Sequence, residues 1–171
     1  MAETIVNYIL DLFSGFGDIK FGKEILVFII SMMPILELRG GLIAASLLGL
    51  KASTSFIICL IGNIIPVPFI LWLITPVFSW LKRRDAFKGF VEKIENKAMS
   101  KKERIEKLQY IGLLLFVGIP LPGTGAWTGC LIAALLDMNK KKAFVATLLG
   151  VLMAGVIMLL LSYGVLDNLI H

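Results

Sequence analysis

The chain has 171 residues, 58% of them hydrophobic and 17% charged, with a formal net charge of +5. A mean hydropathy of +0.90, with long apolar runs, excludes a soluble domain of ordinary composition and indicates an integral membrane protein. The two cysteines, Cys59 and Cys130, lie inside apolar segments, and the one histidine is His171. We therefore expect neither a metal site nor a disulfide, and no cofactor.

The first predicted elements are a surface helix and a broken apolar segment. Residues 3–13 place apolar side chains at helical spacing, which predicts an amphipathic helix at the membrane interface. Residues 25–50 are apolar but interrupted at 34–41, which reads PILELRGG. Residues 55–81 form a long apolar segment that predicts a membrane-spanning helix.

A highly charged segment follows at residues 82–107, with ten Lys or Arg and five Asp or Glu residues. Its apolar residues recur at helical spacing, namely Phe87, Phe90, Val91, Ile94 and Ala98. This pattern predicts an amphipathic helix on the membrane surface, and binding of a partner or of anionic lipid is the alternative.

A second broken segment covers residues 108–137, interrupted by PLPGTGAWTG at 120–129. A basic turn at 138–142 precedes an unbroken apolar segment at 143–163. The order of features therefore repeats that of the first half: a broken segment, a turn and an apolar helix of spanning length.

An internal sequence match supports this repeat. LIAASLLGLK at 42–51 and LIAALLDMNK at 131–140 are identical at six of ten positions, including Lys51 and Lys140. We predict one membrane domain over residues 1–171, with repeat one at 25–81, a linker at 82–107 and repeat two at 108–163.

The broken segments are either re-entrant hairpins or kinked full spans, because lipid cannot satisfy the backbone groups that proline and glycine free. If both broken segments are hairpins, thirteen basic residues lie on the cytoplasmic side (ten in 82–107 and three in 138–142) and three lie outside. If all four apolar segments are full spans, the best arrangement places twelve basic residues inside and four outside. The positive-inside rule favours hairpins, with 82–107 cytoplasmic and both termini outside. The predicted fold is all-α, with two inverted repeats, each a re-entrant hairpin followed by a transmembrane helix.

Two charges in the first break, Glu37 and Arg39, are the main candidates for a binding site. We expect the second half of each hairpin to begin near Gly40–Gly41 and near Thr128–Gly129, so that its N-terminus attracts an anion. Arg39 would bind a phosphate group bidentately. Glu37 either pairs with Arg39, couples protons, or receives a cationic substrate.

Other polar and aromatic residues join the candidate site with less defined roles. Thr124 and Thr128 add hydroxyl groups, Trp127 is a lid or a packing residue, and Asn63 binds a hairpin or joins helices. The PLPGTG run lacks the GK[ST] ending of a nucleotide-binding loop, and nothing in the sequence indicates an enzyme.

The segments PILELRGGLIAA at 34–45 and PLPGTGAWTG at 120–129 resemble signatures of the small multidrug export protein family of prokaryotes. That family is distantly similar to the DedA (SNARE-associated, VTT) superfamily. The resemblance implies a multi-pass protein of the prokaryotic cytoplasmic membrane. The family name implies drug export. The relation to DedA proteins implies transport of lipids or polyprenyl phosphates, with or without proton coupling. It assigns Glu37 and Arg39 to hairpin one, and Pro120, Pro122, Gly123, Thr124 and Gly125 to the tip of hairpin two. DedA-like second hairpins carry arginines near the proline, and this chain has none there.

Three functions follow as hypotheses. The preferred one is a transporter of an amphiphilic anion such as a lipid phosphate, because a buried arginine repels cations. The alternatives are an exporter of cationic drugs that uses Glu37 as the exchange site, and a non-transporting assembly protein. Expected partners are membrane lipids, a small-molecule or amphiphilic substrate and a second copy of the chain, with no nucleic acid.

Overall fold

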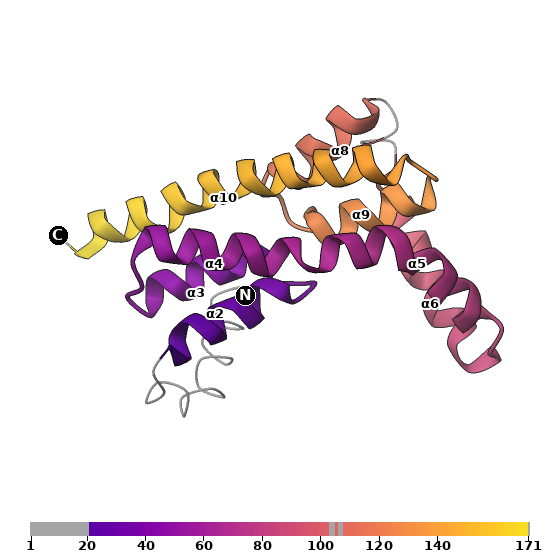
Figure 1. Ribbon diagram of the computed structural model, residues 1–171, viewed down its shortest axis with the longest axis horizontal. Coiled ribbons are helices and arrows are strands. Elements are labelled where there is room, and N and C mark those ends of the chain that lie inside the picture. Colours follow the sequence, from indigo (N-terminus) through magenta and orange to yellow (C-terminus); the bar gives the residue numbers. More distant parts are fainter. Residues whose placement is uncertain (1–20, 103–104, 106–107, 171) are drawn as a thin grey trace. The chain divides into compact units, whose positions relative to one another are not determined.

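The computed structural model describes residues 21–102, 105 and 108–170 (Figure 1). Every regular element in these ranges is a helix, which confirms the all-helical class for this part of the chain. The interfacial helix predicted at residues 3–13 lies outside the described ranges. The helices are α2 (Gly22–Met32), α3 (Glu37–Leu47), α4 (Ala52–Ile64), α5 (Pro66–Lys82), α6 (Asp85–Met99), α8 (Gln109–Gly118), α9 (Ala126–Leu135) and α10 (Lys140–Ile170).

The chain divides into two compact units, and each contains one pair of short helices. The first unit holds α2, α3, α4 and the part of α10 from Val151 onward. The second unit holds α5, α6, α8, α9 and the part of α10 up to Gly150. The unit boundaries therefore fall within the two long helical stretches.

Among the described residues, two helical stretches are long and apolar enough to cross a membrane. The first, Ala52–Lys82, has 31 residues and joins α4 to α5 through Ile65, whose N–H donates to the oxygen of Ile61 at 3.1 Å. The second, Lys140–Gly164, has 25 residues. At about 1.5 Å per residue each exceeds the roughly 30 Å of a hydrocarbon core. They correspond to the spans predicted at 55–81 and 143–163.

The four short helices form two helical hairpins. α2 and α3 have 11 residues each, and α8 and α9 have 10 each. Each helix is therefore about 15–17 Å long, roughly half of a hydrocarbon core. α2 packs against α3, and α8 packs against α9. Figure 1 shows α2 and α3 beside α4.

Both hairpins are closed by a hydrogen bond at the end opposite their tip. In the first, the Lys23 ammonium donates to the carbonyl oxygen of Leu48 at 3.1 Å. In the second, the backbone N–H of Asn139 donates to the Tyr110 hydroxyl at 3.2 Å. The chain thus enters and leaves each hairpin at the same end.

Proline ends the first helix of each hairpin. Met33 and Ile119 are the C-cap residues of α2 and α8, with extended ψ angles of 137° and 118°. Each precedes a proline, Pro34 or Pro120, whose ring disfavours the helical conformation in the residue before it. The breaks are therefore local consequences of the sequence.

The second helix of each hairpin ends in the same left-handed turn. Gly49 has φ 71° and Asp137 has φ 51°. The next residue donates its N–H five residues back, from Leu50 to Ala45 and from Met138 to Ala133, both at 3.0 Å. This pattern is a Schellman motif.

The structural alignment of the two turns differs by one residue from the alignment of the internal sequence match. The sequence pairs Lys51 with Lys140, whereas the turns place Lys51 opposite Asn139. Lys51 is the N-cap of α4, and Asn139 accepts from the N–H of Ala143 at 2.8 Å in the first turn of α10. The identity of Lys51 and Lys140 therefore does not mark equivalent positions.

Gly41 lies where α2, α3 and α4 of the first unit meet. A Cβ atom there would lie 2.0 Å from Ser31 Oγ and 2.9 Å from Cys59 Sγ. Ser31 is itself held by a 2.8 Å hydrogen bond to the carbonyl oxygen of Val27. Only glycine permits this approach, which membrane helices use for close packing.

Glycines play the same part in the second unit, where α8 contacts α9 and α10. A Cβ atom at Gly150 of α10 would lie 2.8 Å from the Leu114 carbonyl oxygen and 2.8 Å from Val117 Cβ. One at Gly129 of α9 would lie 2.8 Å from Val117 Cγ2. Val117 is therefore the side chain around which the three helices pack.

The charged segment forms α6, which packs against α5 and α9. Val91 and Ala98 of its predicted apolar face are buried, but Phe87 and Phe90 are 48% and 63% exposed. The face is thus divided between packing within the unit and outward-pointing aromatic rings. Its position on a membrane surface stays a prediction.

Candidate functional site

The first hairpin tip is short, covering residues 33–36 between α2 and α3. The sequence placed the start of the second half near Gly40–Gly41, and this expectation is wrong. α3 begins at Glu37, so Arg39 lies in its first turn and both glycines lie inside the helix. Gly40 and Gly41 are buried and serve close packing rather than a break.

Glu37 occupies an unusual position for a carboxylate. Its side chain is buried, with 5% exposed, and it is the sole buried carboxyl group among the described residues. Its φ of 52° lies in the left-handed region, which costs a non-glycine residue about 1–2 kcal/mol. Its N–H donates to the Met33 oxygen at 2.9 Å across the tip. Such strain persists where the surrounding structure fixes the residue.

Arg39 is half-buried in the same turn and interacts electrostatically with Glu37. The two opposite charges therefore stabilise each other within the first tip. A guanidinium carries five N–H donors in a planar fork that matches the geometry of carboxylate and phosphate groups.

Asn63 lies in the last turn of α4, next to the part of that helix that packs against α2. The adjacent Gly62 faces the last turns of α2, where an added Cβ would lie 2.8 Å from the Phe28 carbonyl oxygen. Asn63 is 3% exposed, and its Oδ1 has no hydrogen-bond partner within the described part of the chain. A buried amide oxygen without a partner is costly, so it offers an acceptor to a water molecule or a substrate.

The second tip is longer and covers residues 119–125. α9 begins at Ala126, two residues before the start that the sequence suggested near Thr128–Gly129. Gly123 and Gly125 have φ angles of 75° and 142°, a region that glycine adopts without steric cost. The tip therefore depends on its glycines for its backbone path.

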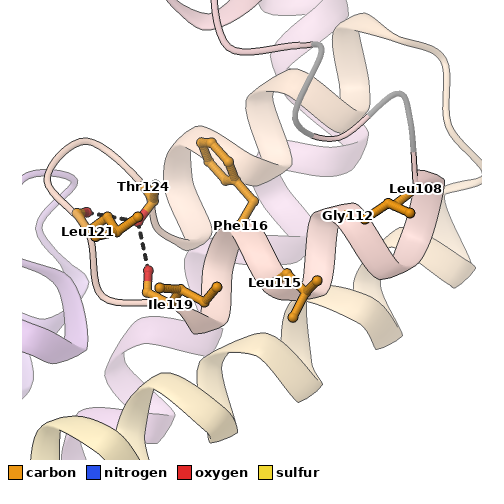
Figure 2. A pocket seen from close by; sticks show the side chains of 7 residues that line it. All are labelled: Leu108, Gly112, Leu115, Phe116, Ile119, Leu121 and Thr124. Carbon is orange, nitrogen blue, oxygen red and sulfur yellow. Dashed lines mark hydrogen bonds between the residues drawn. The ribbon is translucent and has the colours of Figure 1, made fainter.

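Thr124 holds the second tip together. Its hydroxyl lies 3.0 Å from the Ile119 oxygen and 2.8 Å from the Leu121 oxygen, so its one hydrogen is shared between these two carbonyls (Figure 2). The hydroxyl predicted to contact substrate therefore has a structural function as well. The remaining candidates are Pro120, Trp127 and Thr128, which are half-buried, Pro122, which is exposed, and Gly125, which is buried.

A small apolar cavity of about 150 Å³ lies beside this tip, bordered by α8 (Figure 2). An apolar cavity of this size holds a molecule about as large as benzene. It therefore does not provide the predicted phosphate site. Its lining residues are Leu108, Gly112, Leu115, Phe116, Ile119, Leu121 and Thr124.

The sequence analysis missed Lys101. Its ammonium group donates to the carbonyl oxygen of Gly123, which brings a positive charge to the second tip from the linker. Nothing in the PLPGTG motif signals this contact, because Lys101 lies 22 residues upstream in a run of charges. The one hint in the sequence was the absence of an arginine near Pro120, which left the second tip without a positive charge of its own.

The predicted site residues thus fall into two groups. Glu37, Arg39, Gly40, Gly41 and Asn63 belong to the first unit, and the remaining candidates belong to the second. A shared site formed by both tips stays a prediction.

Within the described ranges every regular element is a helix, and two apolar helices are long enough to cross a membrane, which fits a polytopic membrane protein. Residues 37–157 match the family described as "Putative small multi-drug export protein". The match covers 121 of 171 residues (157 − 37 + 1), so the chain belongs to this family. The family's description is that of a membrane exporter. No curated protein and no solved structure matches the chain.

Proposed function

We propose that the chain is a small transporter that moves an amphiphilic anion, such as a lipid or polyprenyl phosphate, past the tips of two re-entrant hairpins. Family membership supports the transporter class. We infer an anionic substrate mainly from the position of Arg39 in the first turn of α3. This turn lies at the tip of a hairpin whose length is about half the thickness of the hydrocarbon core.

The length of the hairpin helices supports a re-entrant arrangement. A helix of 10 or 11 residues reaches about the middle of the hydrocarbon core, so each tip would lie near the midplane. Non-helical backbone at that depth must be buried in protein or line a cavity. One spanning stretch, Ala52–Lys82, separates the hairpins, so they would enter from opposite sides as an inverted repeat.

Each tip presents a cation and a helix N-terminus. Arg39 lies at the start of α3, and Lys101 contacts Gly123 shortly before α9 begins. A helix N-terminus favours negative charge, and a guanidinium binds phosphate through two parallel hydrogen bonds. Residues 119–125 of the second tip contain no basic residue, and Lys101 supplies a positive charge there.

The burial of Glu37 argues against cationic drugs as the main substrate. An exchange site must be reachable, whereas this carboxylate is 5% exposed and interacts with Arg39. Glu37 is the group that would carry a proton if transport is proton-coupled. The alternative role in assembly rests on α6, whose exposed aromatic rings form a surface for contacts.

The test is translocation in reconstituted liposomes. We expect Arg39→Ala to slow the movement of labelled phosphatidylglycerol or a polyprenyl phosphate about tenfold or more, since one charged hydrogen bond contributes about 1.5–3 kcal/mol. Arg39→Lys should recover part of the rate, because it keeps the charge but loses the bidentate geometry. Arg83→Ala, at an exposed linker position, is the matched control.

Rates for both Arg39 variants that equal the wild-type rate would remove Arg39 from the mechanism. The drug hypothesis has its own test in proton-driven uptake of a cationic dye. The drug proposal would replace the anion proposal if Glu37→Gln abolished dye uptake and Arg39→Ala left it intact.

A further inference from the structure

A second, larger cavity lies on the second unit, between α8 and the beginning of α10. Its volume is about 450 Å³. Ile111 of α8 and Val145 and Leu149 of α10 line it and are 63%, 52% and 48% exposed. Three large apolar side chains at one groove are thus left uncovered by the described residues.

Two lysines lie at one end of this groove. Lys141 and Lys142 belong to its lining and to the first turn of α10. The ammonium of Lys142 lies 5.8 Å from the centre of the Tyr110 ring. Lys140 precedes them, and the one acidic neighbour in the turn is the exposed Asp137.

The position of these lysines is unfavourable for the helix itself. The N-terminus of a helix carries a partial positive charge, so lysines in the first turn reduce helix stability. The positive-inside rule accounts for lysines at a membrane boundary in general. It does not account for an apolar groove directly beside them.

We propose that this groove binds an anionic phospholipid, with one acyl chain between α8 and α10 and the phosphate group at Lys141 and Lys142. From Lys141 to Leu149 the groove follows α10 for about 12 Å, close to the roughly 15 Å depth of one hydrocarbon leaflet. Basic pockets between membrane helices are typical sites for anionic headgroups.

The headgroup end of the lipid site lies at the closed end of the second hairpin, away from its tip. The Tyr110–Asn139 hydrogen bond marks this end, and Ile119 of the tip lies about 13 Å further along α8. A lipid here stays bound beside the hairpin and is not the transported substrate. This inference therefore does not depend on the proposed function.

Native mass spectrometry of the detergent-purified full chain tests the site, with phosphatidylglycerol or phosphatidylcholine added. We expect the wild type to retain phosphatidylglycerol about tenfold more strongly, a difference of about 1.4 kcal/mol. Lys141→Gln with Lys142→Gln should remove the preference. Val145→Trp, which fills the groove and keeps both lysines, should lower retention of both lipids.

The matched control is Lys88→Gln with Lys93→Gln, which removes two exposed lysines from α6. It should retain phosphatidylglycerol as the wild type does. Equal loss in the α6 variant would show general charge attraction, and unchanged retention in both groove variants would show that the groove holds no lipid. Either result overturns the proposal. Size-exclusion profiles establish that each variant is folded.

Discussion

The two hairpins have helices of similar length and the same proline break, yet they obtain positive charge in different ways. The first carries Arg39 within its own second helix, next to the buried Glu37. The second has no charge of its own at the tip and receives Lys101 from the linker. A repeated backbone plan therefore does not require a repeated set of side chains.

The tips also differ in what maintains their shape. The first tip spans residues 33–36, and its strain is concentrated at Glu37 with φ 52°. The second spans residues 119–125 and relies on two glycines and the Thr124 hydroxyl. Burial and charge at Glu37 thus distinguish the first tip, whereas the second relies on its glycines and on a side-chain hydroxyl.

This contrast predicts unequal losses of transport, which is the largest effect expected. Arg39→Ala should reduce anion translocation about tenfold or more, and Lys101→Ala about threefold, because a guanidinium binds phosphate through two hydrogen bonds whereas the ammonium of Lys101 makes an exposed contact that water and salt screen. Liposome translocation rates measure both. A larger loss for Lys101→Ala than for Arg39→Ala would reverse the order of importance of the two tips.

Removing the carboxylate charge should destabilise the first tip. Glu37→Gln leaves Arg39 without its opposing charge and should cost about 2 kcal/mol of unfolding free energy. Thermal melting in detergent detects this as a lower midpoint. Glu92→Gln, at an exposed position of α6, is the control. Equal melting of the two variants would show that the pair does not stabilise the tip.

Adding one methyl group to the first hairpin should have a similar or slightly smaller effect. Gly41→Ala would force its Cβ into Ser31 and Cys59, at a cost of about 1–3 kcal/mol. Gly89→Ala adds the same methyl group to α6, where it meets nothing within 4 Å. The melting midpoint should fall for Gly41→Ala alone. A stable Gly41→Ala protein would mean that α3 is not closely packed against α2 and α4 there.

The smallest effect is expected at the second tip. Thr124→Val removes the hydroxyl that donates to Ile119 and Leu121 and should cost about 1 kcal/mol. Amide hydrogen exchange at residues 119–125 provides a local measure beside the melting midpoint. Thr54→Val, exposed on α4, should change neither. A tip whose amides remain equally protected without the hydroxyl would be held by its glycines alone.

Much of the fold follows from the sequence because its causes are local. Hydropathy predicts the two long helices, and Pro34 and Pro120 place the ends of α2 and α8. The glycine pair at 40–41 was misread as a helix break, since its function depends on Ser31 and Cys59 of other helices.

The site was less predictable than the fold for the same physical reason. Glu37 and Arg39 stand out as charges in an apolar run, so the sequence identifies them. Lys101 is one of ten basic residues in its segment, and only the folded chain shows that it contacts Gly123. Contacts across long sequence separation leave no local pattern.

The central claim is that both broken segments are hairpins of opposite orientation, and cysteine labelling tests it most directly. Lys51→Cys and Lys141→Cys would be treated in intact cells with a membrane-impermeant maleimide, with Lys88→Cys as a cytoplasmic control. All three positions are exposed, and the native Cys59 and Cys130 are buried. The hairpin arrangement predicts labelling at position 51 and none at 141 until the membrane is permeabilised. Labelling at both 51 and 141 in intact cells, as four full spans require, would contradict it.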